Sequence, residues 1–304
     1  MNSPYPSPQP APDQRAKAYR AGARIAKERI ARDVPLDAAA LEAVEASDVI
    51  VVSGQYDHVE RVLGALEIPF TQVARGQLPQ VELRREHLLI VNCPGELPEH
   101  DVARIRDFVT IGGSLFTTDW ALRNVVERAF PDTVAYNDRP TRDDVVPVEV
   151  LDDDNPFLRG VIDGRDEPQW WLEGSSYPVR VLDPDRVRVL ISSRELGRRY
   201  GESPVAVLIP WGEGEIFHMI SHYYLQRTEF RSARHAEKAD GYYAEKGMAV
   251  PADLAADIDD LRVGDVESAA GSSRLVANVI AAKKRAATKV ARVERDLAGK
   301  QAER

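Results

Sequence analysis

The 304-residue sequence contains only one cysteine, Cys93. One cysteine cannot form an intrachain disulfide, and it excludes a zinc site built from several thiolates. No apolar run reaches the roughly 18–20 residues that a membrane-spanning helix needs. The N-terminal segment has neither the basic start nor the apolar stretch of a secretory signal. We therefore expect a cytoplasmic protein without a membrane partner.

Hydrophobic residues make up 43% of the chain, which is enough for a substantial core and excludes wholesale disorder. The formal net charge of −9 is unevenly distributed, because the segments 14–32 and 271–304 each carry a local charge of +6. Such basic ends either dock on the acidic body or meet an anionic partner. Nucleic acid is not the expected partner, because Lys283-Lys284-Arg285 lacks neighbouring aromatic residues. A protein partner, or self-association through the terminal helices, fits better.

The sequence divides into four segments. Residues 1–13 carry proline at every second position from Pro4 to Pro12, which predicts a disordered tail. Residues 14–46 form a helical N-terminal extension, with helices expected at 14–32 and 36–46. Residues 47–226 read as one α/β domain. Residues 227–304 form a helical C-terminal extension that ends in a long helix over 273–297.

Short apolar runs alternate with helical patterns in the first half of the α/β segment. We expect strands at 48–53, 70–74, 87–92 and 114–118, and helices at 56–67, 99–110 and 120–130. Further strands are expected at 145–151, 179–182, 187–192, 205–210 and 215–221, the last two as a hairpin. This alternation predicts a doubly wound, mainly parallel sheet of the flavodoxin-like type, with helices on both faces.

Polar segments follow the strands expected at 48–53, 87–92, 114–118 and 215–221. In an open parallel sheet, ligands bind outside the carboxyl ends of the strands, near the point where the strand order reverses. Four polar segments at that edge predict a pocket for a small polar ligand. Its candidate ligand-binding residues are Gln55, Asp57, Glu96, Thr118 and Trp120. Ordinary loop solvation is the competing interpretation for Gln55, Asp57 and Glu96.

Three stretches resemble the class I glutamine amidotransferase-like superfamily, and in particular its ThuA-like and related divergent branches. They are Leu88-Leu-Ile-Val-Asn-Cys-Pro-Gly-Glu-Leu-Pro98, Ile105-Arg-Asp-Phe-Val-Thr-Ile-Gly-Gly-Ser-Leu-Phe-Thr-Thr-Asp119 and Gly212-Glu-Gly-Glu-Ile-Phe-His-Met-Ile-Ser-His222. The resemblance covers roughly residues 47–226. It implies an amidotransferase-like domain whose closing hairpin ends in a histidine, here His222.

The sequence departs from that family at the catalytic cysteine. Family members carry it on a sharp turn within Gly-x-Cys-x-Gly, whereas this chain has Thr117-Thr-Asp-Trp-Ala121. Asp119 takes the place of the nucleophile, and a carboxylate is a far weaker nucleophile towards an amide than a thiolate. We therefore do not expect glutamine hydrolysis by the family mechanism.

Three residues are candidates for catalysis: Asp119, His222 and Cys93. Asp119 is either an acid or base, a metal ligand, or the N-cap of the following helix, and the cap is the leading interpretation. Cys93 is either a nucleophile activated by His222 or a small buried filler. Strand alternation predicts His222 and His218 on one face of a strand, where they either bind a metal together with Asp119 or Glu96 or have a structural role, which is the leading interpretation. We assign no metal and no cofactor.

Trp170 and Trp171 could stack on a ligand, but core packing is the simpler interpretation. Three functions remain open at this level. The leading one is a non-catalytic amidotransferase-like module that binds a small polar ligand or a protein partner, with the basic terminal helices mediating assembly. The alternative is a hydrolase-type enzyme that uses Asp119 and His222, with Cys93 or a metal. The third is a scaffold with a vestigial pocket.

Overall fold

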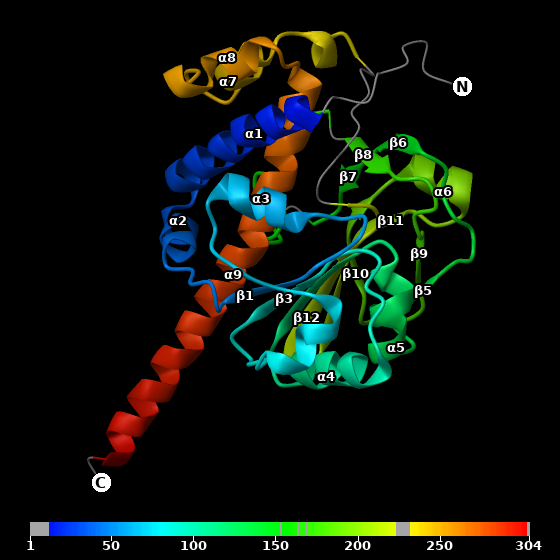
Figure 1. Ribbon diagram of the computed structural model, residues 1–304, viewed down its shortest axis with the longest axis vertical. Coiled ribbons are helices and arrows are strands. Elements are labelled where there is room, and N and C mark those ends of the chain that lie inside the picture. The colour runs from blue at the N-terminus through cyan, green and yellow to red at the C-terminus, as the bar shows by residue number, and fades with distance from the viewer. Residues whose placement is uncertain (1–11, 153, 163, 168, 223–231, 303–304) are drawn as a thin grey trace.

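A computed structural model describes residues 12–152, 154–162, 164–167, 169–222 and 232–302 of the chain (Figure 1). Most of the expected N-terminal tail lies outside these residues. Its last two residues, Pro12 and Asp13, already belong to the first helix, so a tail that extends to residue 13 is wrong at that boundary. Proline suits this position because the first helical residue has no intrahelical hydrogen bond to donate.

One eight-stranded sheet organises the molecule. Its order is β2–β1–β3–β4–β12–β11–β10–β7, and the first five strands run parallel. These five are β2 (Thr71–Val73), β1 (Val49–Val52), β3 (Leu88–Val91), β4 (Ser114–Thr118) and β12 (Gly214–Met219). The antiparallel edge consists of β11 (Pro204–Trp211), β10 (Arg188–Ser192) and β7 (Glu149–Val150). This mainly parallel sheet is compatible with the expected flavodoxin-like fold, and β11 and β12 form the expected hairpin.

Helices cover both faces of the sheet because successive side chains of its buried strands enter two separate cores. In β1, Val49 and Val51 join one core, and Ile50 and Val52 join the other. The first core also takes apolar side chains of α1 (Pro12–Asp33), α3 (Val59–Leu66) and α9 (Val263–Ala302). The second takes those of α4 (Glu99–Thr110), the π-helical turn Leu122–Val126 and α5 (Glu127–Ala129).

The helices from the two ends of the chain form a layer of this domain. In Figure 1, α1 crosses α9 above the sheet, with α2 (Pro35–Glu42) beside them. Gly22 permits the crossing, because a Cβ there would lie 2.5 Å from the backbone nitrogen of Ala270. Basic residues of both helices pair with acids elsewhere in the chain: Lys17 with Asp260, Arg20 with Asp257, Lys284 with Asp48 and Arg285 with Asp37. The basic ends therefore dock on the body, as the first alternative predicted.

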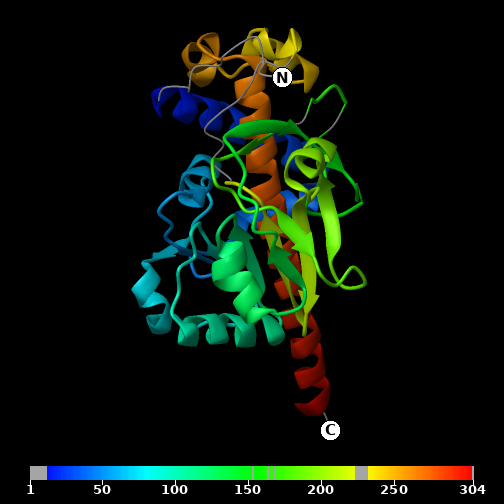
Figure 2. The ribbon, with the colours of Figure 1, turned by 90° about the vertical axis from the view of Figure 1, so that its right-hand side faces the viewer.

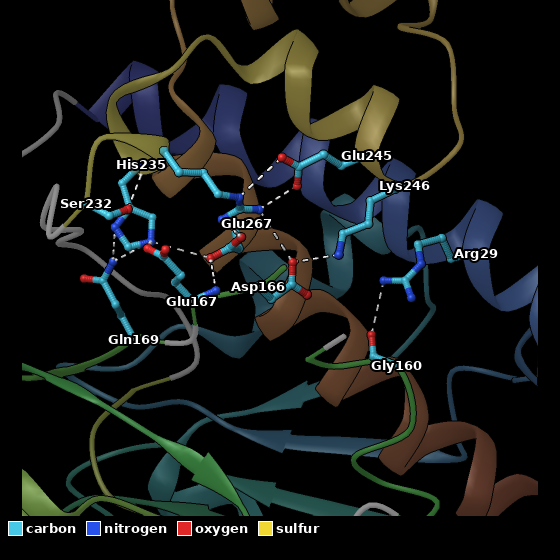
Figure 3. Close-up of polar contacts among 11 residues, drawn as sticks. Arg29, Gly160, Asp166, Glu167, Gln169, Ser232, His235, Glu245, Lys246 and Glu267 are labelled. Atoms are coloured by element: carbon cyan, nitrogen blue, oxygen red, sulfur yellow. Dashed lines mark hydrogen bonds and ion pairs between the residues drawn. The ribbon is translucent and has the colours of Figure 1, made fainter. Parts of the chain in front are cut away.

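An ion-pair network holds the C-terminal helices to the sheet domain (Figure 3). Arg234 lies 2.7 Å from Glu245 of α7 (Ala239–Glu245) and 2.6 Å from Glu267 of α9. Lys246 contacts Asp166 at 2.6 Å, and both side chains are buried. This network connects α7, α9 and the segment before β8 (Gln169–Leu172). A further short helix, α8 (Ala255–Asp259), lies between α7 and α9 in the chain.

Some expected elements differ from the structure. The strand expected at 145–151 is divided into β6 (Asp144–Pro147), which pairs with β8, and β7, which pairs with β10. Pro147 ends β6, since proline has no backbone N–H to continue a ladder. The final helix begins at Val263, ten residues before the expected start at Ser273.

Four short elements of the α/β segment were not expected. They are the 3-10 helix Arg75–Gln80, β5 (Val134–Tyr136), which pairs with β9 (Val179–Val181), β8, and the helix α6 (Arg194–Tyr200). The sequence did carry signals for α6, since the hydroxyl of Ser193 accepts from the Leu196 amide and Gly201 ends the helix in a left-handed conformation.

Candidate functional site

The carboxyl ends of β1, β3, β4 and β12 lie at one edge of the sheet, and polar side chains beyond them meet there. One ligand atom each of Cys93, Asp119 and His222 lie within 4.8 Å of one another, and all three side chains are buried. Asp57, also fully buried, hydrogen-bonds to Thr118 at 2.7 Å. The structure therefore brings together the three candidate catalytic residues and two of the candidate ligand-binding residues.

Asp119 stands on a sharp turn at the end of β4. Its φ of 46° is a left-handed backbone conformation that residues other than glycine seldom adopt. One carboxylate oxygen accepts from the Tyr177 amide at 2.8 Å and the other from the Ser176 hydroxyl at 3.0 Å. Because both oxygens point to the segment after β8, the expected role of Asp119 as a helix N-cap is wrong. Burial raises the pKa of Asp119 to about 6, against the opposing charge of His222.

His222 is the centre of the cluster. Its Nδ1 lies 2.7 Å from a carboxylate oxygen of Glu173, and its Nε2 lies 3.6 Å from Oδ2 of Asp119. Burial by itself lowers the pKa of His222, but the charge of Asp57 and the contacts with Cys93, Glu173 and Asp119 raise it well above the ordinary value. The imidazolium form is therefore stabilised by three acidic side chains.

Cys93 lies beside His222, at the end of β3. Burial raises the pKa of its thiol to about 11, and the contact with His222 opposes this shift. The thiol is therefore neutral near pH 7, where the nucleophilic form of a cysteine is the thiolate. The adjoining turns pack closely, because a Cβ on Gly54 would lie only 2.4 Å from the Cys93 carbonyl oxygen.

Partly exposed aromatic residues lie next to the buried cluster. Trp120 packs edge-on against Tyr56 at 5.3 Å between ring centroids and stacks on Tyr177 at 5.6 Å. Tyr177 in turn stacks on Tyr136 at 3.9 Å. The indole N–H of Trp120 donates to the carbonyl of Ser175 at 2.7 Å, which fixes the ring. Trp120 thus belongs to the border of the site, together with two tyrosines that the sequence did not single out.

Two candidate residues are not brought into the cluster. Gln55 is exposed, and only its backbone amide takes part, donating to the Cys93 carbonyl at 3.0 Å. Glu96 is exposed and pairs with Arg75 at 3.1 Å. For both, the competing interpretation as solvated loop residues fits their position better than a place in the centre of the site.

The expectation that His218 and His222 share one strand face is wrong. β12 ends at Met219, and Ser221 adopts a left-handed φ of 70°, so the alternation of side chains does not extend to His222. The ring of His218 instead contacts the hydroxyl of Thr117 at 2.9 Å. Burial lowers the pKa of His218 to about 3.

Besides Tyr56, three site residues escaped the sequence reasoning: Glu173, Ser176 and Tyr177. They lie between β8 and β9, and β8 itself was not expected. The polar run Glu173-Gly-Ser-Ser176 after two tryptophans was the available signal. Trp170 is buried in the first core, which confirms its interpretation as a core residue, and it donates to the Ile220 carbonyl at 2.8 Å. Trp171 is also buried, but it belongs to neither core: its ring lies edge-on against His222, at 6.3 Å between ring centroids.

Comparisons with known proteins add little to this geometry. No protein-family model and no curated protein matches the sequence. Similar solved structures include a ThuA-like protein from Bacteroides uniformis (TM-score 0.42, 11% identity, covering 58% of this chain and 82% of that one). A cytoplasmic protein from Salmonella typhimurium has a TM-score of 0.41 at 10% identity, covering 58% of this chain and 88% of that one.

An exo-β-1,4-mannosidase from an Opitutaceae bacterium is also similar, with a TM-score of 0.40 and 14% identity over 59% of this chain. The chain spans only 31% of the length of that mannosidase. All these TM-scores lie below 0.5, so no function passes from these proteins to this chain. Among the helices that the structure describes, none is long and apolar enough to cross a membrane.

Proposed function

We propose that this chain is a ligand-binding module on an amidotransferase-like fold, and that it takes a small polar ligand at the edge of the sheet where β1, β3, β4 and β12 end. One observation carries the proposal: side chains from the ends of β1, β3 and β4 and from the segment after β8 converge on His222, which follows β12. Trp120, Tyr56 and Tyr177 border this cluster with aromatic rings, and such rings bind polar ligands by stacking.

Backbone strain supports a functional interpretation of the same place. Asp119, Ser175 and Ser221 all adopt left-handed conformations, with φ values of 46°, 74° and 70°. Each such residue costs on the order of 1–3 kcal/mol and tends to be retained at binding and catalytic sites. All three belong to the turns that position Asp119, Glu173 and His222.

The same geometry argues against glutamine hydrolysis by the family mechanism. The position of the family's nucleophile holds Asp119, and both of its carboxylate oxygens are occupied by Tyr177 and Ser176. Cys93 follows a different strand, β3, and burial holds its thiol in the neutral form. We expect no ammonia release when the protein is incubated with L-glutamine.

A hydrolase remains the second candidate because Cys93 and Glu173 both contact His222. These three residues match the set of a nucleophile, a base and an acid that orients the base. A colorimetric ammonia assay and a p-nitrophenyl acetate assay test this candidate. Turnover that disappears in a Cys93→Ser variant of unchanged melting temperature would favour the hydrolase over the binding module.

Thermal shift measurements test the binding proposal. The wild type is melted with an amino acid (L-glutamine), a monosaccharide (galactose) and a nucleoside (adenosine), each over a concentration series. We expect one of these classes to raise the melting temperature of the wild type and of Trp211→Ala, but not that of Trp120→Ala. Trp211 is a matched control because it lies at the opposite end of the sheet, against Phe130. The proposal is wrong if no class binds, or if Trp120→Ala responds like the wild type.

We further propose that α9 mediates assembly. Its C-terminal part extends beyond the sheet (Figures 1 and 2), and its residues 291–293 are exposed, including Val293 at 50%. Light scattering after size-exclusion chromatography compares the full chain with a chain that ends at Ala286. We expect an oligomer of the full chain that is lost on truncation; a monomeric full chain contradicts this part of the proposal.

A further inference from the structure

We propose that the occupant of the cluster is a single divalent transition-metal ion, with Zn²⁺ the best match, bound by Cys93, Asp119 and His222. This inference rests on the proposed function, because it names what the same site binds. Each of the three side chains offers one ligand atom, namely a thiol sulfur, a carboxylate oxygen and an imidazole nitrogen. The three residues come from the ends of three adjacent strands, β3, β4 and β12.

The spacing of the ligand atoms fits tetrahedral zinc. With bonds of about 2.3 Å to sulfur and about 2.0–2.2 Å to nitrogen and oxygen, two ligand atoms on one ion are separated by roughly 3.3–3.7 Å. Nε2 of His222 and Oδ2 of Asp119 lie 3.6 Å apart, and the whole set lies within 4.8 Å.

The state of His222 is a second, independent observation that points to a ligand. Its side chain is 1% exposed, and among the described residues Nε2 has no hydrogen bond of acceptable geometry, whereas Nδ1 lies against the Glu173 carboxylate. Buried ring nitrogens are normally satisfied, because an unsatisfied buried polar group costs about 1–3 kcal/mol. A metal ion accepts the lone pair of Nε2, which then needs no protein partner.

Outer contacts hold the three ligands in the required orientation. A histidine that binds a metal through one nitrogen typically donates from the other to a carboxylate. Glu173 has this position, 2.7 Å from Nδ1 of His222. Tyr177 and Ser176 fix the Asp119 carboxylate in the same way. The arrangement therefore has the outer carboxylate as well as the inner ligands of a zinc site.

The ligand set also selects the class of metal. Thiolate and imidazole ligands suit zinc and neighbouring transition metals, whereas Mg²⁺ and Ca²⁺ require oxygen ligands. One thiolate and one carboxylate neutralise the two positive charges of the ion, which suits a buried site. Three protein ligands leave one tetrahedral position for water or for the small polar ligand.

Cobalt substitution provides the test, because Cys93 is the only source of a thiolate. The full chain is treated with a chelator, dialysed and titrated with Co²⁺. We expect one Co²⁺ per chain, with a sulfur-to-cobalt charge-transfer band in the near ultraviolet and the intense visible bands of tetrahedral cobalt. Zn²⁺ should displace the cobalt and abolish these bands. This part needs no variant, so it cannot fail through misfolding.

Variants then assign the ligands. Cys93→Ser should abolish the charge-transfer band, and Glu173→Gln should weaken Zn²⁺ affinity by about 10–100-fold without changing the band, since it removes only the outer carboxylate. His100→Gln is the matched control because its side chain is exposed on α4. The inference is overturned if the wild type shows no charge-transfer band, or if Glu173→Gln binds Zn²⁺ as tightly as the control.

These outcomes are distinguishable from those of the proposed function. If the wild type shows no metal signal but does show the Trp120-dependent thermal shift, the small-ligand proposal is supported and the metal proposal is contradicted. If the wild type shows the metal signal but none of the three organic ligand classes raises its melting temperature, the metal proposal is supported and the small-ligand proposal is contradicted.

Discussion

Nε2 of His222 lies 3.6 Å from Oδ2 of Asp119, although the two residues belong to different halves of the chain. They meet because β4 and β12 are adjacent parallel strands, with Thr118 opposite Met219. Each strand is followed by a residue in a left-handed conformation, Asp119 after β4 and Ser221 after β12. The relationship thus depends on strand order and on two unusual turns, and the small-ligand site and the metal site both depend on it.

The strained turn at Asp119 gives a first prediction. Replacement by alanine or by glycine removes the same hydrogen bonds to Ser176 and Tyr177. Of these two replacements only glycine tolerates a φ of 46° without strain, because a left-handed conformation costs a residue with a Cβ roughly 1–2 kcal/mol. We expect Asp119→Gly to be more stable than Asp119→Ala by about 1 kcal/mol in urea unfolding. Equal stabilities would show that the turn is not strained.

His218 should make the fold sensitive to acid. Burial lowers its pKa from 6.5 to about 3 in the folded chain, so the unfolded chain takes up a proton that the folded chain refuses. The free energy of unfolding is therefore unaffected by His218 protonation above pH 6.5. It falls as the pH drops from 6.5 towards 3, by up to about 1.4 kcal/mol per pH unit.

A His218→Asn variant, unfolded by urea at a series of pH values, checks this prediction. Its free energy of unfolding should fall less steeply than that of the wild type between pH 6.5 and 3. His100→Gln serves as the exposed control and should follow the wild type. Parallel curves for the wild type and His218→Asn would contradict the prediction.

The buried ion pair of Lys246 and Asp166 gives a third prediction (Figure 3). Lys246→Met leaves the Asp166 carboxylate buried without its closest cation, and the loss of one partner of a buried pair costs about 3–5 kcal/mol. Lys27→Met is the matched control, since Lys27 and Glu67 form an exposed pair that is worth at most about 1 kcal/mol. Similar melting temperatures for the two variants would contradict this difference.

Two helical glycines give a fourth prediction, because their replacement by alanine should change the stability of the protein in opposite directions. A Cβ on Gly22 would lie 2.5 Å from the backbone of Ala270, so Gly22→Ala should force α1 away from α9 and cost about 1–3 kcal/mol. A Cβ on Gly64 of α3 meets nothing within 4 Å, and Gly64→Ala should stabilise the protein by up to about 1 kcal/mol through helix propensity. Thermal unfolding of both variants checks the signs.

Local patterns predicted many elements of the α/β domain closely. The expected helix 99–110 and strand 114–118 have the bounds of α4 and β4. The first helix differs by only a few residues, since α1 begins at Pro12 instead of residue 14. These elements can be predicted from the sequence because their signals are local. Helical periodicity, apolar runs and the Gly112-Gly113 pair after α4 all involve residues that are close in sequence.

The sequence by itself determined the alternation of strands and helices, the single cysteine and the polar character of the strand ends. Only the tertiary structure decided that Asp119 accepts from Tyr177 instead of capping a helix, that Glu173 faces His222, and that His218 turns away from it. The physical reason is range: periodicity fixes which face a side chain occupies, whereas the meeting of distant side chains depends on strand order and on left-handed turns such as that at Ser221.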